Sequence, residues 1–312
     1  MNQIYRKSPF WSLAGPMLGY LAIQFVVQFA AQLVIEMPYV MRAYAEILRG
    51  SSDTVPSMQE LLNSYMQTLE PAFEAIVRYQ VEIAALSALG TIVLTGILFA
   101  RDRKLEQKAG VILPERAPLS KYWTVVIFGI AGCIAATCLM AMVQLAFYDE
   151  QYQQTAQITY SAGLLVQIIG LGIVTPVAEE LMFRGVLYKR FRERQGFWYS
   201  ALWSSLLFSF MHSNTTQMVY TFLLGVLLSY LYEKFGSFKA PLVLHILLNT
   251  GSVVFTELGV FRYLAGSPAR MAGAVIAGAF LCSVMFVVIQ RMPVRIESRL
   301  NTNDTDRHDM FS

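Results

Sequence analysis

The chain alternates between long apolar runs and short polar segments, a pattern that is typical of a bundle of membrane-spanning helices. A helix needs about 20 apolar residues to cross the hydrocarbon core of a bilayer. Eight runs have or approach this length: 11–37, 81–100, 123–147, 160–187, 197–212, 217–232, 241–255 and 271–289. The sequence therefore predicts an all-α fold, a polytopic membrane helix bundle with about eight transmembrane helices.

The polar segments between these runs suggest three parts. Residues 1–159 hold the first transmembrane helices and an amphipathic segment at about 41–80, which we expect on the membrane surface or in water. This segment is either a site for a protein partner or a gate, or else a solvated linker. Residues 160–255 form a core, and residues 256–312 form the last span and a disordered polar tail. Residues 101–122 and 148–157 are expected to be loops.

Composition favours a protein in contact with a lipid bilayer. Of the 312 residues, 55% are hydrophobic and 14% are charged, whereas a soluble domain carries about 25% charged residues. The net charge of +3 is small, and we expect no nucleic-acid partner. The three cysteines, Cys133, Cys138 and Cys282, lie in apolar runs and are expected to be reduced packing residues.

Positive charge is distributed asymmetrically among the polar segments. If the N-terminus is cytoplasmic, 18 of the 24 Lys and Arg residues fall on the inner side and 5 on the outer side. Cytoplasmic loops of membrane proteins carry such an excess. We therefore expect a multi-pass plasma-membrane protein with both termini in the cytoplasm, and its compact loops favour a bacterial membrane.

The stretch TPVAEELMFRGVL, residues 175–187, places charged groups inside an apolar run, where they are costly and usually functional. Glu180 and Arg184 are four residues apart and share a helix face, so they are expected to form an ion pair. Glu179 points about 100° away from Glu180 and is the candidate general base. Pro176 is expected to kink the helix and open room for water beside Glu179.

Two further helices carry histidines at or inside their apolar runs. His212 lies four residues after Phe208, which packs under the imidazole or lines a substrate pocket. His245 shares a helix face with Asn249. Together they can donate two hydrogen bonds to one oxyanion, or they can form an interhelical polar contact. Simple topology places His212 near the outer end of a short span. To meet the other groups, that span must start deeper or tilt, or the preceding helix must extend past the membrane.

A base, a histidine and a donor pair on three helices fit amide hydrolysis by activated water. Two histidines and one glutamate are also a known catalytic zinc set, so zinc held by Glu179, His212 and His245 remains an alternative, and no cofactor is certain.

The ordered motifs E-E-x-x-x-R (Glu179 to Arg184), F-x-x-x-H (Phe208 to His212) and H-x-x-x-N (His245 to Asn249) resemble the CPBP family of intramembrane proteases. This is the Abi or CAAX-protease family, which includes the Ras-converting CAAX endoproteases. The resemblance covers about residues 163–254. It implies that Glu179 and His212 activate water, while His245 and Asn249 stabilise the oxyanion.

The sequence thus predicts an endopeptidase that cleaves membrane-associated peptides or proteins. One alternative is a non-proteolytic scaffold of the same fold that binds a partner protein. Another is a transporter or proton relay, because intramembrane Glu and His also mark such pathways.

Overall fold

The computed structural model describes residues 8–50, 57–111, 115–146 and 148–293, and these contain helices and no strand. In chain order the elements are α1 (Pro9–Gly50), α2 (Met58–Arg78), α3 (Gln80–Lys108), η1 (Leu119–Lys121), α4 (Tyr122–Ala146), α5 (Glu150–Ser161), α6 (Leu164–Val166), η2 (Gln167–Val174), α7 (Thr175–Glu180), η3 (Leu181–Tyr188), α8 (Lys189–Arg192), α9 (Phe197–Ser209), α10 (Thr215–Phe235), α11 (Lys239–Glu257), α12 (Val260–Ala265) and α13 (Pro268–Gln290). The end of the predicted polar tail, 294–312, lies outside the described residues.

Seven helices in the described part of the chain are long and apolar enough to cross a membrane. Together with the helical content, they confirm the predicted all-α polytopic membrane bundle. The predicted run at 197–212, the fifth along the chain, instead forms α9, which has 13 residues. At 1.5 Å per residue α9 is about 20 Å long, which is less than the hydrocarbon thickness of about 30 Å.

One continuous helical segment, residues 164–192, carries the charged stretch. It contains two π-helical parts, η2 and η3, on either side of the short α-helical part α7. Such π-helical insertions are frequent at functional sites. Two glycines let neighbouring helices approach η2 closely. A Cβ on Gly170 would lie 2.9 Å from the Cβ of Ala85 in α3, and one on Gly172 would lie 2.6 Å from Oγ1 of Thr250 in α11.

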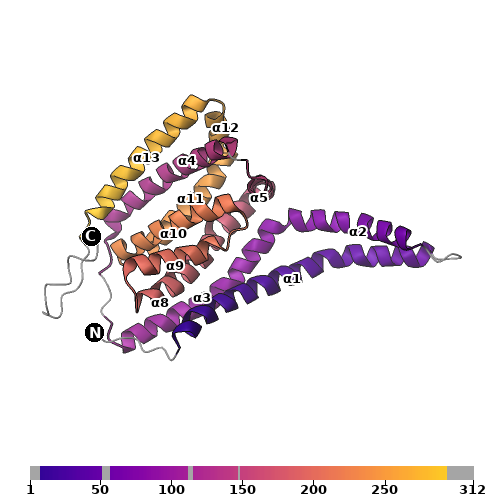
Figure 1. Ribbon diagram of the computed structural model, residues 1–312, viewed down its shortest axis with the longest axis horizontal. Coiled ribbons are helices and arrows are strands. Elements are labelled where there is room, and N and C mark those ends of the chain that lie inside the picture. Colours follow the sequence, from indigo (N-terminus) through magenta and orange to yellow (C-terminus); the bar gives the residue numbers. More distant parts are fainter. Residues whose placement is uncertain (1–7, 51–56, 112–114, 147, 294–312) are drawn as a thin grey trace.

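The predicted loop at 148–157 is largely a helix, α5 (Figure 1). Asp149 caps its N-terminus, because one carboxylate oxygen accepts a hydrogen bond from the backbone N–H of Tyr152 at 3.1 Å. The other oxygen accepts one from the Thr216 hydroxyl at 2.7 Å. These hydrogen bonds, that of Thr216 first, hold the pKa of Asp149 below its ordinary value. The prediction missed the cap, a strong helix-start signal.

The predicted basic loop at 101–122 is also partly helical, because α3 continues to Lys108. Its last turns meet the basic end of the 164–192 segment. Arg190 forms two hydrogen bonds with the carboxylate of Asp102, at 2.7 and 3.1 Å, and Lys189 pairs with Glu106. Lys189 and Arg190, whose charges were assigned to a loop from the sequence, therefore connect the 164–192 segment to α3.

The segment predicted to be amphipathic, 41–80, continues α1 and then forms α2 after a stretch outside the described residues. α2 packs on α1, and α1 packs on α3. In Figure 1 the two helices run side by side and extend away from the rest of the bundle.

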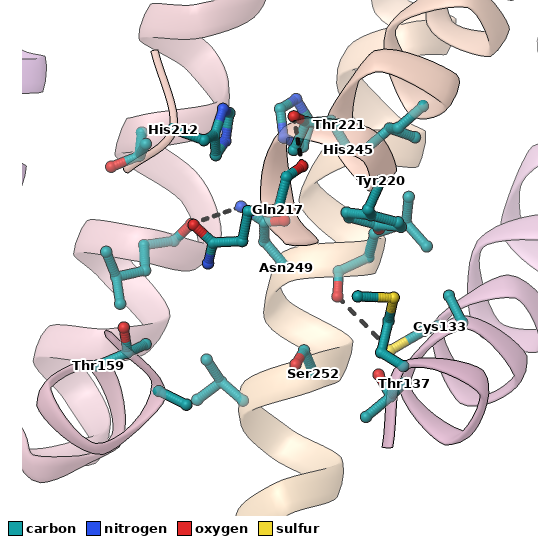
Figure 2. Close-up of a pocket in the computed structure, with 18 of the residues that line it drawn as sticks. Cys133, Thr137, Thr159, His212, Gln217, Tyr220, Thr221, His245, Asn249 and Ser252 are labelled. Atoms are coloured by element: carbon teal, nitrogen blue, oxygen red, sulfur yellow. Dashed lines mark hydrogen bonds between the residues drawn. The ribbon is translucent and has the colours of Figure 1, made fainter. Parts of the chain in front are cut away.

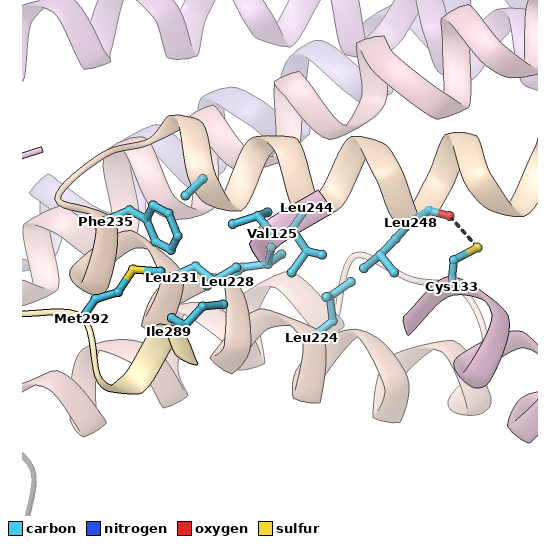
Figure 3. Packing of buried hydrophobic residues seen from close by; sticks show 11 residues of the cluster. Val125, Cys133, Leu224, Leu228, Leu231, Phe235, Leu244, Leu248, Ile289 and Met292 are labelled. Atoms are coloured by element: carbon cyan, nitrogen blue, oxygen red, sulfur yellow. Dashed lines mark hydrogen bonds between the residues drawn. The ribbon is translucent and has the colours of Figure 1, made fainter. Parts of the chain in front are cut away.

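The apolar core lies between α4, α10, α11 and α13 (Figure 3). Val125, Leu228, Phe235 and Leu244 in this cluster are fully buried. This core fixes the positions of α10 and α11, which form one side of the candidate site.

Candidate active site

Glu180 and Arg184 form the predicted ion pair inside the protein. Nη1 of Arg184 donates to Oε1 of Glu180 at 2.8 Å, and both side chains are completely buried. The same Oε1 also contacts Nδ1 of His245 at 3.0 Å. An ionised carboxylate can only accept, so Nδ1 of His245 carries a hydrogen. Glu180 therefore orients both the arginine on its own helix and the imidazole on α11.

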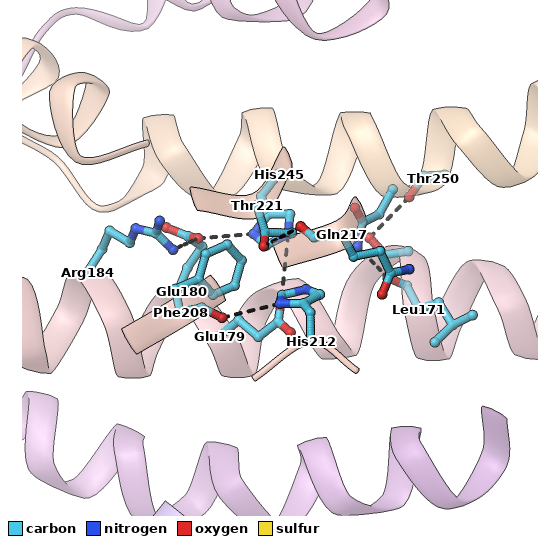
Figure 4. Close-up of polar contacts among 12 residues, drawn as sticks. Leu171, Glu179, Glu180, Arg184, Phe208, His212, Gln217, Thr221, His245 and Thr250 are labelled. Carbon is cyan, nitrogen blue, oxygen red and sulfur yellow. Dashed lines mark hydrogen bonds and ion pairs between the residues drawn. The ribbon is translucent and has the colours of Figure 1, made fainter. Parts of the chain in front are cut away.

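Glu179 lies on the other side of the same imidazole. Its Oε2 is 3.5 Å from Nε2 of His245. Glu179 is less buried than Glu180, and it lines the cavity described below. The two adjacent glutamates thus face opposite ring nitrogens of one histidine, an arrangement that their sequence spacing alone could not predict (Figure 4).

His212 follows the end of α9 and also lines this cavity. Its Nδ1 lies 3.2 Å from the carbonyl oxygen of Phe208. A carbonyl oxygen only accepts, so Nδ1 donates, and in a neutral ring Nε2 is left as the acceptor. An imidazole in this form can take a proton from a water molecule.

The short length of α9 explains how His212 reaches the level of Glu179. The helical segment continues from Glu179 to Arg192, and α9 then returns over 13 residues. Each stretch spans about 20 Å at 1.5 Å per residue, so the chain comes back to the depth from which it left. The preceding helix continues to Arg192, as one of the alternatives considered for the sequence requires, and its extension past the membrane stays a prediction.

Phe208 packs among the polar groups. Its ring lies 4.6 Å from the guanidinium carbon of Arg184, and its centroid is 5.1 Å from that of His212 and 5.9 Å from that of His245. It is fully buried. A cation over an aromatic face is stabilised when desolvated, and Phe208 thereby supports both Arg184 and the two imidazoles.

Asn249 and its neighbour Thr250 bind the backbone near Pro176. Nδ2 of Asn249 donates to the Leu171 carbonyl at 3.1 Å, and the Thr250 hydroxyl donates to the Gly172 carbonyl at 3.2 Å. Pro176 has no backbone N–H, so it cannot donate the helical hydrogen bond to the Gly172 carbonyl. Thr250 therefore satisfies this carbonyl, and the room for water that we expect beside Glu179 stays a prediction.

A cavity of about 380 Å³ brings the candidate residues together. Glu179, His212, His245 and Asn249 all line it, and the last three are labelled in Figure 2. Further lining residues come from α4, α5 and α10, and sequence reasoning missed them, among them Thr137, Tyr152, Thr159, Gln217 and Thr221. A helix predicted at 150–161 would have placed the cavity-lining residues of this stretch on one face.

The zinc alternative was tested against the donor groups. Within the described ranges, no three His, Cys, Asp or Glu side chains are grouped so that they could hold a metal ion. Each histidine uses one ring nitrogen in a contact with Phe208 or Glu180 and keeps the other, as a metal-ligating histidine also does, so these contacts do not decide the question. Because Glu179, His212 and His245 are not grouped as a metal-holding set in this part of the chain, they do not fit a metal in this arrangement, and we derive no step through one. The three cysteines are free.

Comparison with known proteins identifies the central part of the chain. A family model described as "Type II CAAX prenyl endopeptidase Rce1-like" matches residues 161–251, a stretch that contains all three motifs. The predicted resemblance to the CPBP, or CAAX-protease, family is therefore confirmed, and it rests on the part of the chain that forms the site.

Two curated relatives match a similar share of the chain. One is "Putative membrane peptidase YdiL" of Bacillus subtilis (strain 168), 28% identical over 116 residues, which are 37% of this chain and 47% of the relative. The other is "Uncharacterized 24.3 kDa protein" of Escherichia coli, 31% identical over 97 residues, or 30% and 45% of the two chains. The chain thus spans about half the length of the relatives it matches. No solved structure matches it.

Proposed function

We propose that this protein is an intramembrane endopeptidase that hydrolyses peptide bonds of membrane-associated peptides or proteins. The observation that carries the proposal is the shared cavity, because Glu179, His212, His245 and Asn249 come from three separate segments and all line it. The family match and the name of the Bacillus relative support a protease of the CAAX type.

In the proposed mechanism, a water molecule lies between Glu179 and the free Nε2 of His212. Glu179 accepts a proton as the water oxygen attacks the carbonyl carbon of the substrate, and the carbonyl oxygen becomes an oxyanion. His245 in its imidazolium form donates from both nitrogens, and its Nε2–H together with Asn249 stabilises this oxyanion. The proton then passes to the leaving amine, and the peptide bond breaks.

Replacing Glu179 tests the general-base role. Glu179→Gln keeps the size of the side chain but cannot accept the proton, so we expect cleavage to fall by at least about 10²-fold, the usual contribution of a general base. Cleavage is measured by comparing membrane-protein fragments in cells that express either form. Glu257→Gln, the same change at an exposed position on α11, should retain activity. Full activity of a folded Glu179→Gln protein would contradict the assignment.

A further inference from the structure

Gly225 on α10 is in close contact with both α9 and the buried guanidinium of Arg184. A Cβ at this position would lie 2.7 Å from the Cβ of Ser205 in α9 and 2.9 Å from Nη2 of Arg184. Carbon atoms in favourable contact are about 3.5–4.0 Å apart. Position 225 therefore has no room for a side chain unless α9 or the guanidinium moves.

The guanidinium of Arg184 is held by a hydrogen bond at one end and by packing at the other. Nη1 donates to Oε1 of Glu180 at 2.8 Å, whereas Nε and Nη2 have no hydrogen-bond partner among the described residues. The ring centroid of Phe208 lies 4.6 Å from the guanidinium carbon. The position of the Nη2 end is therefore set by the shape of the space that Phe208 and Gly225 leave.

The position of Arg184 is linked to that of His245 through one oxygen atom. Oε1 of Glu180 accepts from Nη1 of Arg184 and contacts Nδ1 of His245 at 3.0 Å (Figure 4). The other ring nitrogen of His245 lies 3.5 Å from Glu179. Closely packed interiors transmit displacements, so a shift of the guanidinium that moves Oε1 also changes how His245 faces the cavity.

We propose that Gly225 is a positioning residue for the site. Because it has no side chain, the guanidinium of Arg184 has the space it needs, and Arg184 and Glu180 in turn hold His245 in place. Gly225 is not among the described residues that line the cavity, although Thr221 and Leu224 beside it are. It acts through Arg184 and does not touch the substrate. The effect on cleavage rests on the proposed function, whereas the effect on His245 does not.

The first test observes His245 directly by NMR of the purified protein in detergent. The chain has three histidines, His212, His245 and His308, so isotope labelling of histidine gives few signals, and the one lost in His245→Gln is assigned to His245. Its Nδ1 hydrogen is held by a carboxylate and should exchange slowly enough to be observed. We expect Gly225→Ala to shift or abolish this signal. An unchanged signal in folded Gly225→Ala protein would overturn the proposal.

Gly278 on α13 offers a matched control. A Cβ there would lie 2.7 Å from the Cβ of Ala135 and 2.8 Å from the carbonyl oxygen of Ala131 in α4, so the crowding is as severe as at Gly225. None of these three residues is among the described residues that line the cavity. Gly278→Ala should lower the unfolding temperature and leave the His245 signal in place. If both variants change this signal equally, the effect is a general loosening of the bundle and the proposal is wrong.

A double variant tests whether the effect passes through Arg184. Arg184→Lys keeps a cation that can pair with Glu180 but removes Nη2, the atom that a Cβ at position 225 would meet. Gly225→Ala should therefore change the His245 signal less in the Arg184→Lys background than in the wild type. Equal changes in the two backgrounds would show that the residues are not coupled and would overturn the route through Arg184.

The consequence for cleavage is measured on the membrane-protein fragments whose formation depends on Glu179. Gly225→Ala should lower their amount by up to about 10²-fold, the cost of misplacing a reacting group by about 1 Å, and Gly278→Ala should not. Wild-type cleavage by a Gly225→Ala protein with an altered His245 signal would contradict the positioning role. If the wild type yields no Glu179-dependent fragment, the proposed function fails, and the NMR comparison still decides whether Gly225 positions His245.

Discussion

At the scale of single residues, the site depends on how buried charged groups share partners. Oε1 of Glu180 serves both Arg184 and His245, so neither contact can be lost without affecting the other. Arg184 is fully buried, and Phe208 covers its guanidinium. Removing one member of a buried ion pair leaves the other charge without compensation, which costs more than removing both.

Arg184→Met should therefore destabilise the protein by about 3 kcal/mol or more, the usual cost of an unpaired buried charge. The double variant Arg184→Met with Glu180→Gln should recover part of this loss. Thermal unfolding in detergent of the two single variants and the double variant provides the cycle. Strictly additive losses would show that the two residues are not energetically coupled.

Asn249 and Thr250 form a natural pair for separating a catalytic from a structural role. Each donates a hydrogen bond to a backbone carbonyl of η2, but the proposal gives an oxyanion-stabilising role to Asn249 only. Asn249→Leu should lower kcat by about 10²-fold or more, as loss of an oxyanion donor does. Thr250→Val should cost about 1–3 kcal/mol of stability for the unsatisfied carbonyl and keep kcat. Similar kcat values for the two variants would argue against the oxyanion role.

At the scale of elements, two short helices decide the geometry of the site. α9 is too short to cross the membrane, and this length returns His212 to the depth of Glu179. α5 occupies a stretch that appeared to be a polar loop and closes one side of the cavity. Neither helix has a long apolar run, so an interpretation based on hydrophobic length alone undervalues both.

The attachment of α5 to α10 should depend on pH through Asp149. The pKa of its carboxyl is lowered in the folded protein, so the stabilisation is complete above the ordinary Asp pKa of about 3.9 and is lost as the pH falls through the lowered value. Thr216→Val removes the largest cause of the shift. Hydrogen exchange of α5 should be faster in this variant at pH 7, and the difference from wild type should shrink below about pH 4. A difference independent of pH would contradict this account.

At the scale of the whole molecule, charge and helix arrangement fit one orientation. In Figure 1 the end of α3, the start of α4, α8 and the end of α13 lie at the same end of the bundle, and the described basic residues of 101–108 and 189–192 belong to these helices. Part of this charge is neutralised by pairs such as Arg190 with Asp102. The excess on this side nevertheless agrees with the positive-inside rule.

Cysteine accessibility tests the orientation. In a background without the three natural cysteines, Lys104→Cys and Arg262→Cys place exposed reporters at opposite ends of the bundle. A membrane-impermeant maleimide should label Arg262→Cys in intact cells, and Lys104→Cys only after permeabilisation, because the positive-inside rule predicts that the basic side lies in the cytoplasm. The reverse pattern would show that the N-terminus is outside.

The sequence by itself determined the membrane class, the helical fold, the resemblance to the family and the identity of the charged residues, because length, hydropathy and residue spacing are local properties of the chain. It also predicted the pair of Glu180 and Arg184, which are one helical turn apart. Only the tertiary structure decided which residues share partners. Three features arise from the packing of helices that are distant in sequence. They are the contact of His245 with both glutamates, the hydrogen bond from Thr250 to the Gly172 carbonyl, and the position of α5 beside the cavity. No periodicity within one helix specifies the register between two.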